Sequence, residues 1–156
     1  MINPAIRRQS GATIVEMAII APVFLLVLLA LVELSLMFFT TLTMQYAVRE
    51  GARYAITGQR NLGPGTSDQQ RYNAIIDNIS SNALGLYEKM DPVISVNGKA
   101  YPRNTYSSGM FGEPGSIIVL QIDCTLPVTT PLLSQFFQDG KYRFAVSAAM
   151  RNEFFL

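Results

Sequence analysis

Hydrophobic residues are concentrated near the start of this 156-residue chain. From Ala12 to Phe39 the only ionisable side chains are Glu16 and Glu33. As a helix this stretch would be about 42 Å long at 1.5 Å per residue, which exceeds a hydrocarbon core of about 30 Å. The pattern predicts a membrane-spanning helix, with a local kink at Pro22 because proline removes one backbone hydrogen bond.

Beyond the apolar stretch, small and apolar residues recur at the spacing of one helix face. The first 57 residues are therefore expected to form one long helix whose last part is amphipathic. Its apolar stripe would pack on the sheet of its own domain or, alternatively, on a sister subunit. The stripe consists of Met44, Ala47, Val48, Gly51, Ala52, Ala55 and Ile56, and its small residues imply close packing.

Residues 58–156 carry the turn signals and short periodic segments of one small folded domain. Gly, Pro, Asn and Ser are frequent between Gly58 and Asp68, which marks a loop after the long helix. Asp68 is expected to cap a second helix that runs through Leu84 and ends at Gly85. The apolar face of this helix consists of Tyr72, Ile75, Ile76, Ile79 and Ala83.

A hairpin signal follows the second helix. Asn97 and Gly98 predict a tight turn between strands at 92–96 and 99–101, because both residues tolerate positive φ. Interruptions by Gly and Pro predict a surface loop over 102–116 that presents aromatic residues.

The last part of the domain alternates between apolar and polar residues. This pattern predicts a half-buried strand over Ser116–Leu126, with Cys124 facing the core, and a final antiparallel strand over Tyr142–Met150. Between them, 127–138 is expected to form a loop or short helix that lies over the core. The expected fold class is α+β: a long N-terminal transmembrane helix extending into a small domain with an antiparallel sheet and one or two packed helices.

Composition and charge argue against several classes of function. The formal net charge is +1 and the basic residues are scattered, so no electrostatic footprint for nucleic acid is present. The chain has no histidine, and its single cysteine, Cys124, can form no internal disulfide. We therefore expect no catalytic residue, no metal, no cofactor and no small-molecule substrate; a cation site assembled from separate carboxylates is the alternative.

A carboxylate at the mouth of a membrane span calls for a partner, because a charge inside a span costs about 2.5 to 3.5 kcal/mol on insertion scales. Glu16 occupies this place, and its alternative is to reach the headgroup region. Basic residues flank the span on both sides, so they do not decide its orientation. The short first tail without acidic residues favours a cytoplasmic N-terminus.

Gly11, followed by Ala-Thr-Ile-Val, Glu16 and a long apolar helix, resembles the class III signal of type IV prepilins. The string Tyr46-Ala-Val-Arg-Glu-Gly-Ala-Arg-Tyr-Ala55 and the closing Ala148-Ala-Met-Arg-Asn-Glu153 are similar to the TadE-like family of Tad (Flp, type IVc) pilus systems. The Ala21-Pro22 pair is similar too. The resemblance covers both ends of the chain.

The resemblance implies that residues 1–11 are a prepilin-type leader, with Arg7 and Arg8 in its basic cytoplasmic part. A prepilin peptidase would cut between Gly11 and Ala12. After cleavage, Glu16 would be the fifth residue and would meet an N-terminal amine when subunits assemble.

The same resemblance implies a domain organisation and a location. Residues 12–57 would be the transmembrane and amphipathic helix, and 58–156 an extracytoplasmic domain. The protein would be a single-pass protein of the bacterial inner membrane, with a cytoplasmic N-terminus and a periplasmic C-terminal domain, and a candidate for incorporation in the pilus.

The implied function is that of a non-enzymatic, low-copy pilin-like subunit, a minor pilin or pseudopilin, that supports pilus biogenesis, adhesion and surface colonisation. Its expected partners are the inner membrane, the prepilin peptidase, other pilin-like subunits and the pilus assembly platform. Ala12, Met17 and the size of the domain depart from the pattern of major pilins. An unprocessed signal-anchored adaptor and a membrane-anchored enzyme are the alternatives.

Overall fold

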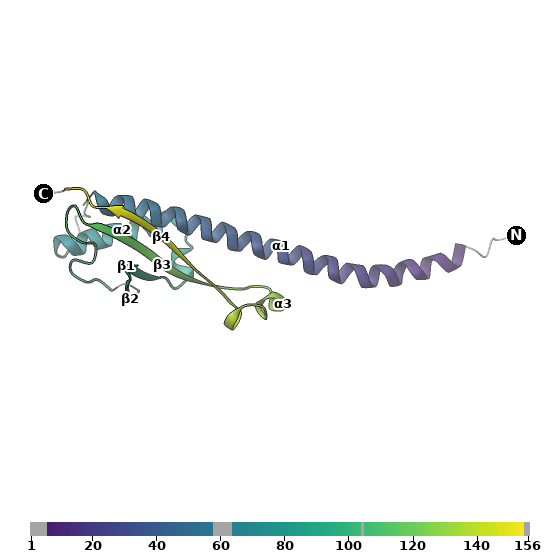
Figure 1. Cartoon of the computed structure of the whole chain (residues 1–156). Coiled ribbons are helices and arrows are strands. Elements are labelled where there is room, and N and C mark those ends of the chain that lie inside the picture. Colours follow the sequence, from purple (N-terminus) through teal and green to yellow (C-terminus); the bar gives the residue numbers. More distant parts are fainter. Residues whose placement is uncertain (1–5, 58–63, 104, 155–156) are drawn as a thin grey trace.

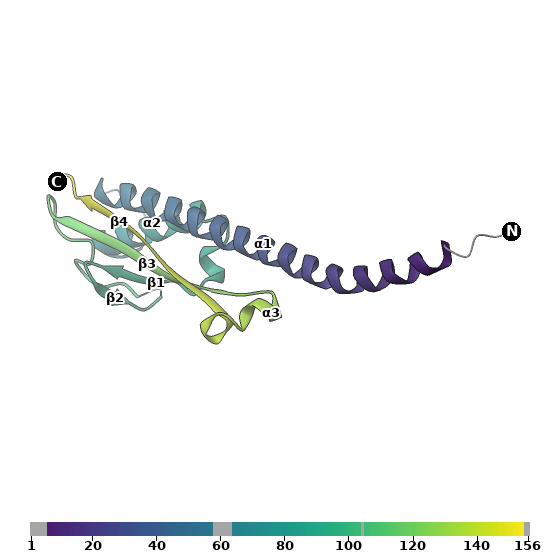
Figure 2. The same cartoon turned by 45° about the vertical axis from the view of Figure 1, so that its right-hand side comes forward.

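One helix runs the length of the molecule and carries a small domain on its C-terminal half (Figure 1). The computed structural model describes residues 6–57, 64–103 and 105–154, with side chains from residue 11 onward. The long helix, α1, extends from Ile6 to Ile56 without interruption at Pro22. Its N-terminal part, drawn in purple, curves gently in both views (Figure 2).

The domain combines a second helix with four strands, so the expected α+β class is confirmed. The strands form one antiparallel sheet in the order β2-β1-β3-β4. The longer elements are α2 (Ser67–Asn82), β1 (Val93–Val96), β2 (Lys99–Tyr101), β3 (Ile117–Pro127) and β4 (Lys141–Arg151), and the short helical turns are η1 (Tyr87–Lys89), α3 (Pro131–Ser134) and η2 (Gln138–Gly140).

The hairpin between β1 and β2 forms where Asn97-Gly98 predicts it. Asn97 has a φ of 51° and Gly98 a φ of 79°, and the flanking residues Val96 and Lys99 pair across the turn. Two consecutive positive φ values give a turn whose twist matches that of the strands.

The core lies between the sheet and the two helices. On β3, alternate residues are buried, as the sequence predicts; they are Ile118, Leu120, Ile122 and Cys124. Ile75 and Ile79 of α2 contribute to the same cluster, together with the small residues of α1. The alternation on β3 is the sequence signal for a sheet with one face on the core.

Three local expectations are wrong. Thr66 rather than Asp68 caps α2, since its hydroxyl accepts the N–H of Gln69 at 3.4 Å, and α2 ends at Asn82. The 102–116 loop does not present all its aromatic residues, because Phe111 is only 3% exposed and contacts the core. The connection between β3 and β4 does not cover the core: none of the α3 residues is buried.

Candidate membrane and assembly site

The first half of α1 is not covered by the domain. Side chains from Gly11 to Val32 are exposed, apart from half-buried Ala30. Among the described residues, one helix, Gly11–Ile56, is long and apolar enough to cross a membrane, and its most apolar window has no residue buried inside the molecule. An apolar surface of this size needs an apolar environment, which supports membrane anchoring.

Gly11 and Glu16 lie on this uncovered part of α1. A Cβ added to Gly11 would have no atom within 4 Å, so packing within the chain does not require glycine there. Glycine inside a helix costs about 1 kcal/mol relative to alanine. The side chain of Glu16 is exposed. Arg7 and Arg8 lie on the first turns of α1, and their side chains fall outside the described part.

The second half of α1 packs into the domain along one stripe. The structure buries Ala47, Ala52 and Ala55 fully, against α2 and the sheet of the same chain. The stripe begins three turns before Met44, the first residue that sequence periodicity assigns to it. Its buried members are Glu33, Met37, Thr40, Met44, Ala47, Val48, Gly51, Ala52 and Ala55.

At Gly51, α1 approaches α2 closely. A Cβ at this position would lie 2.2 Å from Cγ1 of Ile79 and 2.8 Å from its Cδ1. Any side chain at residue 51 would therefore displace the Ile79 side chain or the helix that carries it. The glycine is explained by packing, unlike Gly11.

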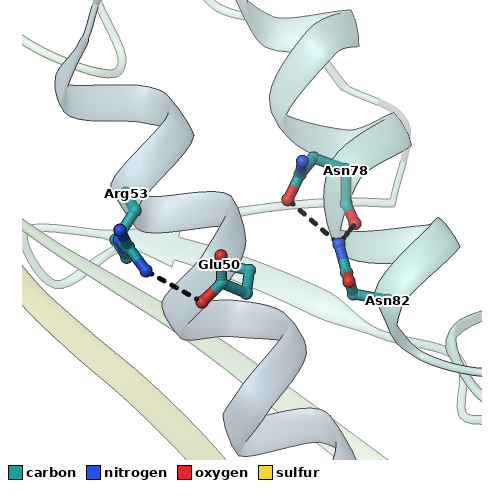
Figure 3. A network of polar contacts seen from close by, with 4 residues as sticks. All are labelled: Glu50, Arg53, Asn78 and Asn82. Carbon is teal, nitrogen blue, oxygen red and sulfur yellow. Dashed lines mark hydrogen bonds and ion pairs between the residues drawn. The ribbon is translucent and has the colours of Figure 1, made fainter.

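The solvent side of the same helix pair is polar (Figure 3). Arg53 donates from Nη1 to Oε1 of Glu50 at 3.3 Å, one turn along α1. On α2, the Asn82 amide donates to the carbonyl and the side-chain oxygen of Asn78, at 2.8 and 3.3 Å. Each pair stays within its own helix and stabilises that helix by a few tenths of a kcal/mol. Together the two pairs form a polar edge of the contact between α1 and α2.

The C-terminal end of α1 is closed by residues that the sequence analysis missed. Arg71, 7% exposed, donates from Nε and Nη2 to the carbonyl of Ala55, at 3.2 and 2.7 Å, and from Nη2 to Oδ1 of Asn152 at 3.2 Å. The N–H of Glu153 donates to the carbonyl of Ile56 at 3.0 Å. The positive charge of Arg71 at this end also interacts favourably with the negative pole of the helix dipole. The sequence feature that could have indicated a buried role for Arg71 is its position next to Tyr72 on an otherwise apolar helix face.

A second missed contact joins the middle of α1 to the β3–β4 connection. Glu33 is 7% exposed; its Oε1 accepts the N–H of Thr129 and its Oε2 the hydroxyl of Thr130, both at 2.9 Å. The carboxylate thus has two donors where the apolar stretch of α1 meets the domain. The available signal was the spacing, because Glu33 lies four residues before Met37 and eleven before Met44, on the same helix face.

Groups capable of chemistry are not gathered in the described part of the chain. No three Cys, Asp or Glu side chains there are placed to hold a metal ion. Burial, with a smaller effect from Asp123, raises the pKa of the Cys124 thiol to about 12, so at neutral pH it is an unreactive thiol. Burial likewise raises the pKa of Tyr87 to about 12.

Comparison with known families bears on α1. The family model described as TadE-like protein matches residues 11–53. Over these residues the chain is similar to the TadE-like family. The TadE-like match begins at Gly11 and includes Glu16, Glu33 and Gly51. It therefore spans both the exposed half of α1 and most of the buried stripe. The TadE-like family is a pilus-associated structural family, which suggests a Tad pilus-associated protein.

Neither the comparison with curated proteins nor the comparison with solved structures finds a match.

Proposed function

We propose that this chain is a low-copy pilin-like subunit of a Tad-type pilus assembly and secretion machine. The observation that carries the proposal is the TadE-like match over residues 11–53, which begins at the glycine expected before the scissile bond. The uncovered apolar half of α1 supports it, because such a helix can exchange a lipid environment for a bundle of similar helices. Through the pilus, the protein supports adhesion and surface colonisation.

The proposed topology follows the sequence. Residues 1–11 are the leader, with Arg7 and Arg8 on its cytoplasmic side, 12–57 form the membrane and amphipathic helix, and 58–156 form the periplasmic domain of an inner-membrane protein. The partners are the prepilin peptidase, other pilin-like subunits and the assembly platform.

Peptidase recognition accounts for Gly11 better than folding does. Nothing lies within 4 Å of an added Cβ at this position, so the helix carries the cost of a glycine without any gain in packing. A residue that the chain itself does not need is free to serve an external enzyme.

The first experiment is the N-terminal mass of the full chain expressed with and without its prepilin peptidase, with Gly11→Val as the control variant. A mature chain that begins at Ala12, and that appears only with peptidase and intact Gly11, is the expected result. A chain that keeps its leader under both conditions would overturn processing and leave the signal-anchored adaptor as the function.

Glu16 is proposed to pair with the amine of Ala12, its own or a neighbour's. In a helix bundle of low dielectric, an unpaired carboxylate is expensive, and pairing offsets this cost and fixes the axial register of subunits. Glu16→Gln is therefore expected to preserve cleavage but to reduce pilus output, since about 1.4 kcal/mol of lost pairing lowers a subunit association constant tenfold.

The measurement is sheared pilus yield together with the N-terminal mass. Glu50→Gln is the matched control, because Glu50 lies on the same helix and bonds only to Arg53 among the contacts seen. Equal pilus yields from wild type and Glu16→Gln would rule out the pairing.

A further inference from the structure

The connection between β3 and β4 extends beyond the rest of the domain, along α1 and toward its N-terminus. In both views α3 lies beside the middle of α1 (Figures 1 and 2). The connection exposes two large apolar side chains, Leu132 (56% exposed) and Phe136 (82%), beside the polar Thr129 and Gln135. No residue from Cys124 to Gln138 is charged. This uncharged segment, 128–137, is called the tip below.

The tip lies at the height where α1 would leave a bilayer. Glu33 fixes it there, because its carboxylate accepts hydrogen bonds from Thr129 and Thr130. The 21 residue steps from Ala12 to Glu33 span about 32 Å at 1.5 Å per residue. A hydrocarbon core is about 30 Å thick. With Ala12 at one face of the bilayer, Glu33 and the tip lie at the other.

The residues around the tip follow the polarity of a membrane surface. Directly after it come Asp139, Lys141 and Arg143, with Arg143 and Asp139 paired at 2.9 Å. Tyr142 lies between Phe137 and Phe144, with ring centroids 6.3 and 5.2 Å apart. An apolar tip with charged and aromatic residues at its base is typical of segments that rest in the headgroup region.

The neighbouring surface of α1 is apolar at the same height. Leu34, Leu36 and Phe38 are 52%, 50% and 63% exposed. The exposed apolar side chains of the tip and those of α1 therefore lie at the same level along the span, because Glu33 holds the tip there. This continuity indicates lipid as the occupant of the tip's surface.

We propose that the tip inserts Leu132 and Phe136 into the domain-side leaflet and acts as a second membrane contact beside α1. The proposal rests only on the membrane anchoring that is part of the proposed function, not on processing or pilus assembly. Two contacts instead of one fix the height and tilt of the domain above the membrane. Glu33, at the boundary, is shielded from lipid by the residues that hydrogen-bond to it.

The chain contains no tryptophan, so a single introduced Trp reports on its own surroundings. The experiment places full-length Phe136→Trp in nanodiscs of phosphatidylethanolamine and phosphatidylglycerol, at one chain per disc, with added phosphatidylcholine brominated near the headgroup or near the chain end. Phe24→Trp, 62% exposed on the span, and Ile117→Trp, 68% exposed at the far end of β3, are the control variants.

The expected result is blue-shifted Phe136→Trp emission that is quenched more by shallow than by deep bromine. Ile117→Trp should emit as in water, and Phe24→Trp should be quenched by the deeper bromine. Phe136→Trp emission equal to that of Ile117→Trp would overturn the proposal while leaving the anchor intact. A blue shift that needs several chains per disc would assign the tip to a second copy instead. Unquenched Phe24→Trp would overturn the anchor and the tip contact together.

Discussion

At the scale of single residues, two charged side chains occupy faces that sequence patterns assign to the core. Glu33 accepts a backbone N–H and a hydroxyl from the β3–β4 connection, and Arg71 donates to the carbonyl of Ala55 near the end of α1. Burying a charge is expensive unless hydrogen bonds satisfy it. Both residues therefore join segments distant in sequence, and each depends on the fold to provide its partners.

Cys124 makes the free energy of unfolding depend on pH, because burial favours its neutral thiol over the thiolate. Burial raises the pKa of Cys124 to about 12 from an ordinary value of 9.0. The folded state thus holds this proton more tightly than the unfolded state does. The contribution to stability is fully present below pH 9 and is lost as the pH rises toward 12, by about 1.4 kcal/mol per pH unit over that window.

The measurement is the midpoint of urea-induced unfolding of the full chain in detergent at several pH values from 7 to 11. Circular dichroism of the domain monitors the unfolding. Cys124→Ala is the control variant, and its midpoint should begin to fall only near pH 10, where Tyr72 and Tyr87 of the unfolded chain ionise. The same onset in both proteins would show that the thiol does not contribute.

At the scale of elements, the seam between α1 and α2 depends on one missing side chain. Gly51→Ala would place a Cβ 2.2 Å from Cγ1 of Ile79. We expect it to destabilise the domain by about 1 to 3 kcal/mol, because overpacking in a well-packed core forces the backbone apart. Thermal unfolding of the full chain in detergent gives the value.

A double-mutant cycle with Ile79→Ala separates the clash from other effects of the substitution. Without the Ile79 side chain, Gly51→Ala should be neutral or stabilising, since alanine is favoured over glycine in a helix by about 1 kcal/mol. An unchanged penalty for Gly51→Ala in the Ile79→Ala background would contradict the packing explanation.

The elements also show how far local patterns reach. Asn97-Gly98 predicted the β1–β2 hairpin. The spacing of apolar residues predicted α1, α2, β3 and β4, because each of these patterns is local. It did not predict the inward fold of Phe111 or the position of α3, because contacts with distant segments decide both. Glu33 and Thr130 are 97 residues apart, and no local pattern connects them. Spacing places Glu33 on the buried face of α1, but its partners Thr129 and Thr130 could not be found from sequence.

At the scale of the whole molecule, the Glu33 contacts connect the membrane-facing half to the folded half. Glu33→Ala removes both acceptors and leaves the N–H of Thr129 without its partner. A hydrogen bond to a charged group contributes about 1.5 to 3 kcal/mol, and because Thr129 is exposed, water offsets part of this loss. We expect faster amide exchange over 128–137, measured by hydrogen–deuterium exchange of the full chain in detergent.

Thr130→Val is the graded control, because it removes one of the two hydrogen bonds and keeps the side-chain volume. Its effect on exchange should be smaller than that of Glu33→Ala. Equal protection of the 128–137 segment in all three proteins would show that Glu33 does not hold it.

The closure of α1 by its distant C-terminal partners constrains synthesis as well as structure. Asn152 accepts a hydrogen bond from Arg71, the N–H of Glu153 donates to the carbonyl of Ile56, and β4 packs on the same helix. These residues are made about a hundred positions after the α1 segment they complete. At a synthesis rate of about 5 to 20 residues per second, the apolar stripe of α1 stays exposed for about 5 to 20 s before β4 is complete. The finished fold can therefore arise only after translation has passed residue 153, and until then this face of α1 lacks its partners.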